Sequence, residues 1–162
     1  MSKKNVSNSH VEMAEIVFPN DANPLGNMLG GKVMHLIDIA ASMSAMRHCR
    51  KPVVTASVDS LDFRYPIKVG NMILLKASVN YTHKTSMEVG VRVESENPLT
   101  GRRYHTSSAY LTFVALDDHG KPTEVSAVVP ETEEEEERFK AAELRRAYRM
   151  ENLSKEKKGK EN

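Results

Sequence analysis

The sequence predicts an α+β domain in which one long, buried helix packs against a five-stranded antiparallel sheet, with a second helix near the C-terminus. The helical stretch, residues 29–47, is apolar around nearly its whole circumference, as is typical of a helix buried on most sides. Five other segments alternate between apolar and polar residues, as strands do. The last four are joined by short connections, which favours antiparallel neighbours.

The predicted strands lie on both sides of the helix in the chain. Residues 10–18 form the first strand, and a loop rich in Pro, Asn, Asp and Gly follows at residues 19–27. Four strands come after the helix, at residues 53–65, 71–82, 86–96 and 103–116, with turns at 83–85 and 97–101. The apolar residues of the 53–65 segment change parity near Asp59 and Ser60, which predicts a bulge or bend there.

The composition divides the chain into four segments. These are a disordered N-terminus at 1–9, the α+β domain at 10–130, a helix at 131–153 and a disordered tail at 154–162. Thr132 and Glu135 match a capping box, and a solvated helix is favoured over an acidic binding tail. One sheet covers only part of an apolar helix and leaves an edge strand exposed. The architecture therefore predicts at least a dimer.

The overall composition narrows the function classes. The net charge of +1 gives no overall field that would favour nucleic acid or an anionic membrane. No apolar run approaches the roughly 20 residues that span a bilayer, and the N-terminus lacks the apolar segment of a signal peptide. The single cysteine, Cys49, cannot form an internal disulfide, so we expect a cytoplasmic protein. The scattered histidines predict no metal site, and no separate cofactor is expected.

Asp38 is the residue most informative about function. It lies between Ile37 and Ile39 in the predicted helix, where Asp is an unfavourable residue. A carboxylate among apolar neighbours is costly unless it is paired or used, and no Lys or Arg stands one turn away to neutralise it. A general base is therefore favoured. The alternative is a structural role, in which Asp38 caps a backbone group or meets a distant cation.

Two glycines, Gly30 and Gly31, stand at the start of the helix. The first N–H groups there have no helical partner, and glycine lets a substrate approach the backbone closely. This predicts an oxyanion hole, with a tight turn as the alternative. Gly31 and Asp38 are about 10 Å apart along the helix axis, so we expect the loop or a partner chain to complete the site. Asn23, in the preceding loop, is a turn former whose amide could also orient a water or a carbonyl.

The basic residues form no single run. A few of them near the cleft could bind the phosphates of a cofactor-like thiol. Spacing alone does not choose among the candidates, which are Lys32, Arg47, Arg50, Lys51, Arg64, Lys68, Lys84, Arg102 and Arg103.

Residues 21–38 resemble the opening of hotdog-fold acyl-CoA thioesterases, specifically the YciA-like bacterial enzymes and the brain-type cytosolic acyl-CoA hydrolases. The family pattern is an Asn, a variable pair and a Gly, then Gly-Gly, with an Asp or Glu seven residues further on. This chain supplies it with Asn23, Gly26, Gly30-Gly31 and Asp38. The resemblance extends from residue 11 to about 150 and includes segments 53–55, 62–63, 65–67, 69–70, 85–89 and 95–101.

The resemblance implies a hotdog fold and a dimer with two composite sites, usually assembled as a trimer of dimers. It implies that Asp38 activates water, that Asn23 reaches the site from the facing subunit, and that the amide near Gly31 polarises the thioester carbonyl. CoA would lie along the subunit boundary near Thr85 and Ser86. The predicted substrate-binding residues are Gly30, Val54, Arg64, Thr85 and Ser86.

The predicted activity is hydrolysis of acyl-CoA to a fatty acid and free CoA. Asp38 would act as a general base or as a nucleophile that forms an anhydride. One rival is a non-catalytic acyl-CoA sensor, but such proteins usually carry a DNA-binding segment and the first nine residues are too short for one. A hydratase is the other rival and would pair His35 with Asp38, although a packing role is favoured for His35.

Overall fold

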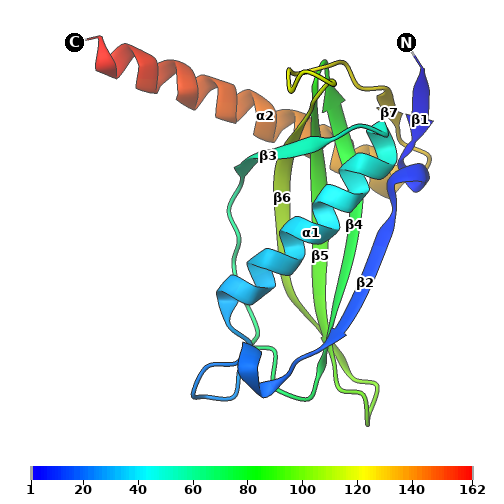
Figure 1. Ribbon diagram of the computed structural model, residues 1–162, viewed down its shortest axis with the longest axis vertical. Helices are drawn as coiled ribbons and strands as arrows, with labels where there is room; N and C mark the ends of the chain where they lie inside the picture. The colour runs from blue at the N-terminus through cyan, green and yellow to red at the C-terminus, as the bar shows by residue number, and fades with distance from the viewer. Residues whose placement is uncertain (1, 162) are drawn as a thin grey trace.

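The computed structural model describes residues 2–161, and its main feature is a sheet curled around one long helix (Figure 1). The helix is α1, Gly30–Cys49. The antiparallel sheet has the strand order β2-β4-β5-β6-β3. Its strands are β2 (Val11–Ile16), β3 (Val53–Val58), β4 (Met72–His83), β5 (Ser86–Glu96) and β6 (Arg103–Ala115). The predicted α+β architecture is therefore confirmed.

The core lies between the inner face of the sheet and α1. Alternation places every second side chain of the long central strands on that face. Each large apolar side chain buried there contributes about 1.5–3 kcal/mol. The largest of them are Leu36, Ile37, Ile73, Leu75, Val79, Met87, Val89, Val93, Leu111 and Phe113.

The N-terminal segment is ordered, so the prediction of disorder for residues 1–9 is wrong over Lys3–Ser9. A short strand, β1 (Lys3–Asn5), pairs in parallel with β7 (Ala127–Val129). The 3₁₀ turn η1, Val6–Ser9, follows, and Val6 and Ser9 are buried. The Ser9 hydroxyl accepts a hydrogen bond from the Val79 amide of β4. The polar composition of this segment therefore does not reveal that Val6 and Ser9 are buried and attach it to the domain.

The C-terminal helix, α2 (Glu133–Lys160), lies on the outer face of the sheet and then projects beyond it (Figure 1). The Glu135 amide donates to the Thr132 hydroxyl, which confirms the N-cap half of the predicted capping box. The Glu135 carboxylate accepts from the Glu131 amide instead of the Thr132 amide. The helix continues past residue 153, so the prediction of a disordered tail at 154–162 is wrong as far as Lys160. Residues 1 and 162, the outer ends of the two segments predicted to be disordered, lie outside the described residues.

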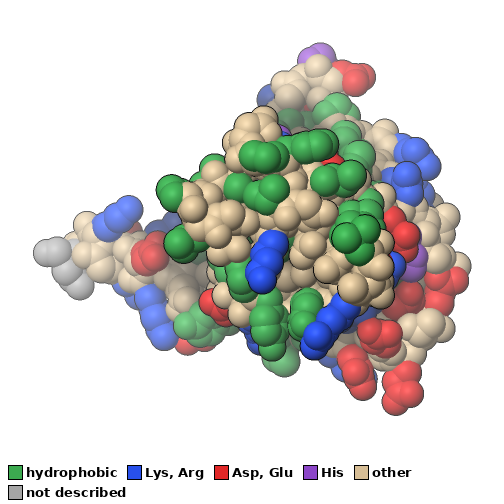
Figure 2. Space-filling view, turned by 90° about the horizontal axis from the view of Figure 1, so that it is seen from below, with side chains coloured by type: hydrophobic (Ala, Val, Ile, Leu, Met, Phe, Trp, Pro, Cys, Tyr) green, Lys and Arg blue, Asp and Glu red, His purple; other side chains and the backbone are tan. Residues whose placement is uncertain are grey.

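One strip of α1 remains exposed, although the sequence predicts burial on most sides. Leu36, Ile37 and Ala40 face the sheet and are buried, whereas Met34 and Asp38 are exposed. Exposed apolar side chains also gather at the end of the molecule where α1 begins (Figure 2). They include Phe18, Leu25, Leu29, Phe63 and Tyr65. Within a single chain, the predicted burial is therefore only partly achieved.

β3 is shorter than predicted and bends at a different position. It ends at Val58 instead of residue 65, and its register with β6 shifts between Thr55 and Ser57 instead of near Asp59 and Ser60. Beyond Val58, the Asp59 and Arg64 amides donate to the Tyr110 and Thr106 carbonyls of β6. Because β3 is an edge strand, Val54 is 47% exposed.

A charge pair fastens α2 to the outer face of the sheet. The Glu88 carboxylate of β5 is 3% exposed and receives two hydrogen bonds from the Arg145 guanidinium, at 2.7 and 3.1 Å. The guanidinium also lies 3.6 Å from the centre of the Tyr110 ring. Further along α2, Arg149 pairs with Asp59 at 3.2 Å, which ties the helix to the end of β3.

Replacing Arg145 by Met should lower the free energy of unfolding by about 3 kcal/mol, because the Glu88 carboxylate would stay buried without its partner. Urea unfolding of the two proteins measures the difference. Lys140→Met, at an exposed position of the same helix, is the matched control and should change stability by less than about 0.5 kcal/mol. Equal losses in both variants would show that the Glu88 pair has no special role.

Candidate active site

Asp38 and Thr55 come together where α1 passes the edge strand. The Thr55 hydroxyl donates to Asp38 Oδ1 at 2.8 Å. Thr55 stands opposite the buried Phe113 in the register of β3 and β6, so its side chain lies on the face of the sheet that packs against α1. No donor to Asp38 Oδ2 is found among residues 2–161. The carboxylate is therefore oriented by one oxygen and can accept a proton on the other.

The surroundings of Asp38 differ from the apolar setting that the sequence predicts. Ile37 is buried, but Asp38 is exposed because successive side chains of a helix point about 100° apart. No cation pairs with Asp38 in the described part of the chain. The sequence predicted that no cation would lie near Asp38. The prediction that Asp38 is buried is wrong within a single chain.

The helix start presents free backbone donors. Lys32 and Val33 both donate their amides to the Leu29 carbonyl, at 3.0 and 3.1 Å, so helical bonding begins at Lys32. The amides of Gly30 and Gly31 have no acceptor among residues 2–161. A Cβ atom at Gly31 would meet nothing within 4 Å. This end of α1 can therefore receive a carbonyl oxygen that becomes an anion.

Asn23 organises its loop with one side of its amide. Its Oδ1 accepts hydrogen bonds from the amides of Leu25 and Asn27, at 3.0 and 3.1 Å. Both partners are donors, which fixes the oxygen and leaves the NH₂ group with two free protons. The turn-forming role is present, and the amide still has donors to offer. Among the described residues no hydrogen bond joins Asn23 to Asp38.

Three of the predicted substrate-binding residues lie at one end of the sheet. Val114 of β6 is in register with both Val54 of β3 and Ser86 of β5. Val54 and Ser86 are therefore two strands apart, about 10 Å. Thr85 adjoins Ser86 in the β4–β5 turn and accepts a hydrogen bond from the Ala115 amide.

The other two predicted substrate-binding residues lie near the opposite end. Gly30 begins α1, and the Arg64 amide donates to the Thr106 carbonyl near the start of β6. Thr106 and Val114 are about 26 Å apart along that strand. A single chain therefore separates the predicted substrate-binding set into two groups.

Thr55 is the site residue that the sequence reasoning missed. The alternation favours an apolar face made of Val54, Ala56 and Val58, which would direct Thr55 outward. The register shift after Thr55 alters the alternation, so that Thr55 faces α1 and Val54 faces outward. The useful signal is a hydroxyl residue in the strand that follows the helix, but choosing Thr55 over Ser57 requires knowledge of where the bulge lies.

Two general expectations concern metal or cofactor binding and the crossing of a membrane. In residues 2–161, no group of three His, Cys, Asp or Glu side chains could hold a metal ion. The expectation that neither a metal nor a separate cofactor is needed stays a prediction. No helix of the described chain is long and apolar enough to cross a membrane.

Comparison with known proteins identifies relatives over most of the chain. A family model of the thioesterase superfamily matches residues 25–101. YkhA of Bacillus subtilis, named as an acyl-CoA thioester hydrolase, is 49% identical over 127 residues, or 78% of this chain and 74% of YkhA. The cytosolic acyl coenzyme A thioester hydrolase of Rattus norvegicus is 38% identical over 136 residues, or 83% of this chain and 36% of that protein.

Solved structures agree with these relatives. A hexameric acyl-CoA thioesterase without ligand superposes with a TM-score of 0.92 at 42% identity, covering 94% of this chain and 98% of that one. An acyl-CoA hydrolase of Staphylococcus aureus, solved with butyryl-CoA and CoA, gives a TM-score of 0.86 at 39% identity over 96% and 97% of the two chains. That enzyme has also been solved with alanine in place of one Asp, one Thr or one Asn.

The fold and the comparisons support the same assignment. The helix wrapped by a five-stranded sheet, the match of residues 25–101 and the extensive identity to YkhA point to one family. The chain belongs to the thioesterase superfamily and has its hotdog fold.

Proposed function

We propose that this protein hydrolyses acyl-CoA thioesters to a fatty acid and free CoA, with Asp38 as the general base. The observation that carries the proposal is the bond from Thr55 to Asp38 Oδ1, because it leaves Oδ2 free to accept a proton. Asp38 takes a proton from water while the water oxygen attacks the thioester carbon. The amide of Gly31 stabilises the oxyanion, and the C–S bond then breaks to release the CoA thiolate, which takes up a proton.

The Staphylococcus aureus variants support the choice of residues. The intervals along that chain between the substituted Asn, Asp and Thr equal the intervals between Asn23, Asp38 and Thr55 here. Substitution of these three positions singles them out in a protein named as an acyl-CoA hydrolase. The correspondence supports a proposed site that contains Thr55 as well as Asp38 and Asn23.

A second copy of the chain completes the proposed site. The exposed strip of α1 runs from the apolar end in Figure 2 to the free edge of β3, where Asp38 meets Thr55, and these surfaces need a cover. Two copies that share one continuous sheet with both helices on the same face pair their β3 edges antiparallel. In such a dimer we expect Asn23 of a neighbour to lie near Asp38. The hexamer formed by the relative in the solved structure supports a trimer of such dimers.

A non-catalytic acyl-CoA sensor is the alternative function. A sensor needs a binding surface but no oriented carboxylate beside unbonded amides, so the bond between Thr55 and Asp38 favours hydrolysis. We also propose a cytoplasmic location. The name of the Rattus norvegicus relative supports it, and so does the buried free thiol of Cys49, which is in keeping with a reducing compartment.

Asp38→Asn should lower kcat by about 10²–10⁴-fold, because the amide keeps the shape of the side chain but cannot take the proton. Thr55→Val should lower kcat by about 10²-fold through loss of orientation, with a smaller change in KM. Release of free thiol from a panel of acyl-CoA chain lengths measures both effects. Thermal unfolding establishes that the variants are folded.

His35→Gln is the matched control, since His35 is exposed on α1 three residues before Asp38. Near-native thiol release from this variant would eliminate the His35–Asp38 pair of a hydratase. Near-native turnover by Asp38→Asn would instead overturn the proposed mechanism.

Mixing two inactive variants tests whether the site is shared between subunits. In a mixed dimer of Asp38→Asn and Asn23→Ala, one site carries both changes and the other carries neither. Random assembly should therefore restore about a quarter of wild-type thiol release. Co-expression with two different affinity tags isolates the mixed dimer. If Asn23 served Asp38 of its own chain, no activity would return.

A further inference from the structure

Lys68 and Arg102 converge on a pocket of about 330 Å³ at the end of the sheet where α1 begins. The other residues that line it are proline, asparagine, serine, threonine and tyrosine, so none of the described lining residues is a carboxylate. Across residues 2–161, neither Lys68 nor Arg102 forms an ion pair. Two unneutralised cations facing neutral hydrogen-bonding groups are suited to a phosphate.

Local structure orders the backbone of both residues. The Arg102 guanidinium lies 4.9 Å from the centre of the Tyr104 ring, and its backbone carbonyl accepts from the Asn97 amide at 2.9 Å. The Lys68 carbonyl accepts from the Asn71 amide at 3.0 Å, which closes a tight turn. A ligand would therefore meet groups whose backbone is already ordered, and this reduces the entropy cost of binding.

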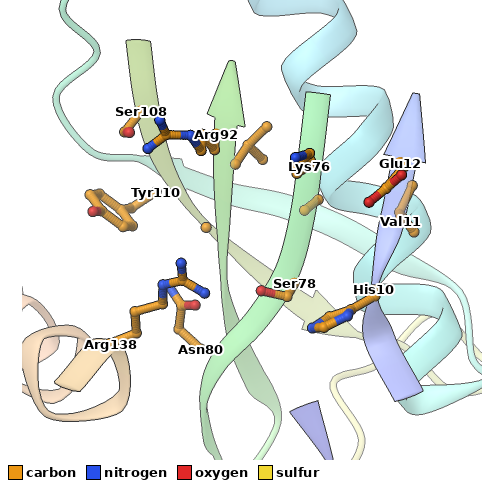
Figure 3. A pocket seen from close by; sticks show the side chains of 13 residues that line it. His10, Val11, Glu12, Lys76, Ser78, Asn80, Arg92, Ser108, Tyr110 and Arg138 are labelled. Atoms are coloured by element: carbon orange, nitrogen blue, oxygen red, sulfur yellow. The ribbon is translucent and has the colours of Figure 1, made fainter. Parts of the chain in front are cut away.

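A larger pocket on the outer face of the sheet provides a contrast (Figure 3). It also contains cations, but Glu12 lines it, and Arg92 and Arg138 each pair with a carboxylate of their own. The hydrogen bond from Arg92 lowers the pKa of Glu94 below its ordinary value, which keeps that carboxylate charged. The charges of the outer pocket are therefore largely balanced, whereas those of Lys68 and Arg102 are not.

A series of contacts links the Lys68–Arg102 pocket to the proposed site of chemistry. Lys68 pairs with Asn27 of the Asn23 loop through an isolated bridge. The ring of Phe63 packs against Gly30, where a Cβ atom on the glycine would lie 3.6 Å from the ring. Two residues further on, the Tyr65 ring stands 5.6 Å from that of Tyr104, on which Arg102 rests. A surface lined with aromatic rings therefore leads from the helix start to the two cations.

We propose that Lys68 and Arg102 bind the phosphate groups in the nucleotide portion of the CoA thioester. This inference rests on the proposed function, because the thioester is placed at Gly31 and the pantetheine arm must carry the phosphates away from it. The predicted CoA contacts at Thr85 and Ser86 lie at the opposite end of the same chain. In a dimer joined by antiparallel β3 edges, the Thr85–Ser86 turn of the second copy lies on the same side as this pocket.

Two thioesters separate phosphate recognition from chemistry. Lys68→Met and Arg102→Met should each lower kcat/KM for an acyl-CoA about tenfold, chiefly through KM. The same variants should lower kcat/KM for the matching S-acyl-pantetheine less than twofold, since that substrate carries no phosphate. Thermal unfolding checks that the variants are folded. Lys76→Met removes a lysine from the outer pocket and is the matched control.

The selectivity ratio between the two substrates decides the question. A tenfold fall in the ratio for Lys68→Met and Arg102→Met, with an unchanged ratio for Lys76→Met, supports the assignment. An unchanged ratio for the first two variants overturns it while wild-type hydrolysis still supports the proposed function. If the wild-type protein hydrolyses neither thioester, the proposed function itself has failed, and the phosphate assignment fails with it.

Discussion

The rest of the structure depends on covering α1. This helix is apolar on nearly every side, but one curled sheet buries only the face that carries Leu36 and Ile37. A strip with Met34 and Asp38 remains exposed, and Asp38 lies beside the edge strand β3. Exposed apolar surface and an unpaired strand edge are both unfavourable in water. The same constraint therefore creates the need for a second copy and places the carboxylate where that copy would bind.

The bond between Thr55 and Asp38 depends on the irregular part of the sheet. A regular β3 continuing to residue 65 would keep one parity throughout, but the register shifts after Thr55 and the strand ends at Val58. The segment that then leaves the sheet carries Phe63 to Gly30 and Tyr65 to Tyr104. Arg149 of α2 binds Asp59 where this segment begins. The pair formed by Arg149 and Asp59 thus links α2 to the start of the loop that packs against the beginning of α1.

Sequence reasoning succeeded where a pattern is local and failed where pairing decides the outcome. β5 was predicted with its observed bounds, because Met87 to Val93 alternate without interruption. The bulge in β3 was misplaced, since its position is set by the register with β6. Asp38 was identified from its unusual place in a helix, but its exposure depends on which side the sheet covers. The contact of Thr55 with Asp38 and the shared pocket of Lys68 and Arg102 were not predictable, because only the folded sheet brings these residues together.

The distribution of charge links binding to chemistry. The net charge of +1 gives the molecule almost no overall field, so recognition must come from local imbalance. On the outer face arginines are matched by glutamates, whereas Lys68 and Arg102 have no ion-pair partner in residues 2–161. Binding energy gained at phosphates far from the thioester does not by itself lower the barrier. It acts on the reaction by fixing the carbonyl against the Gly31 amide, so that water beside Asp38 meets a carbon already held in place.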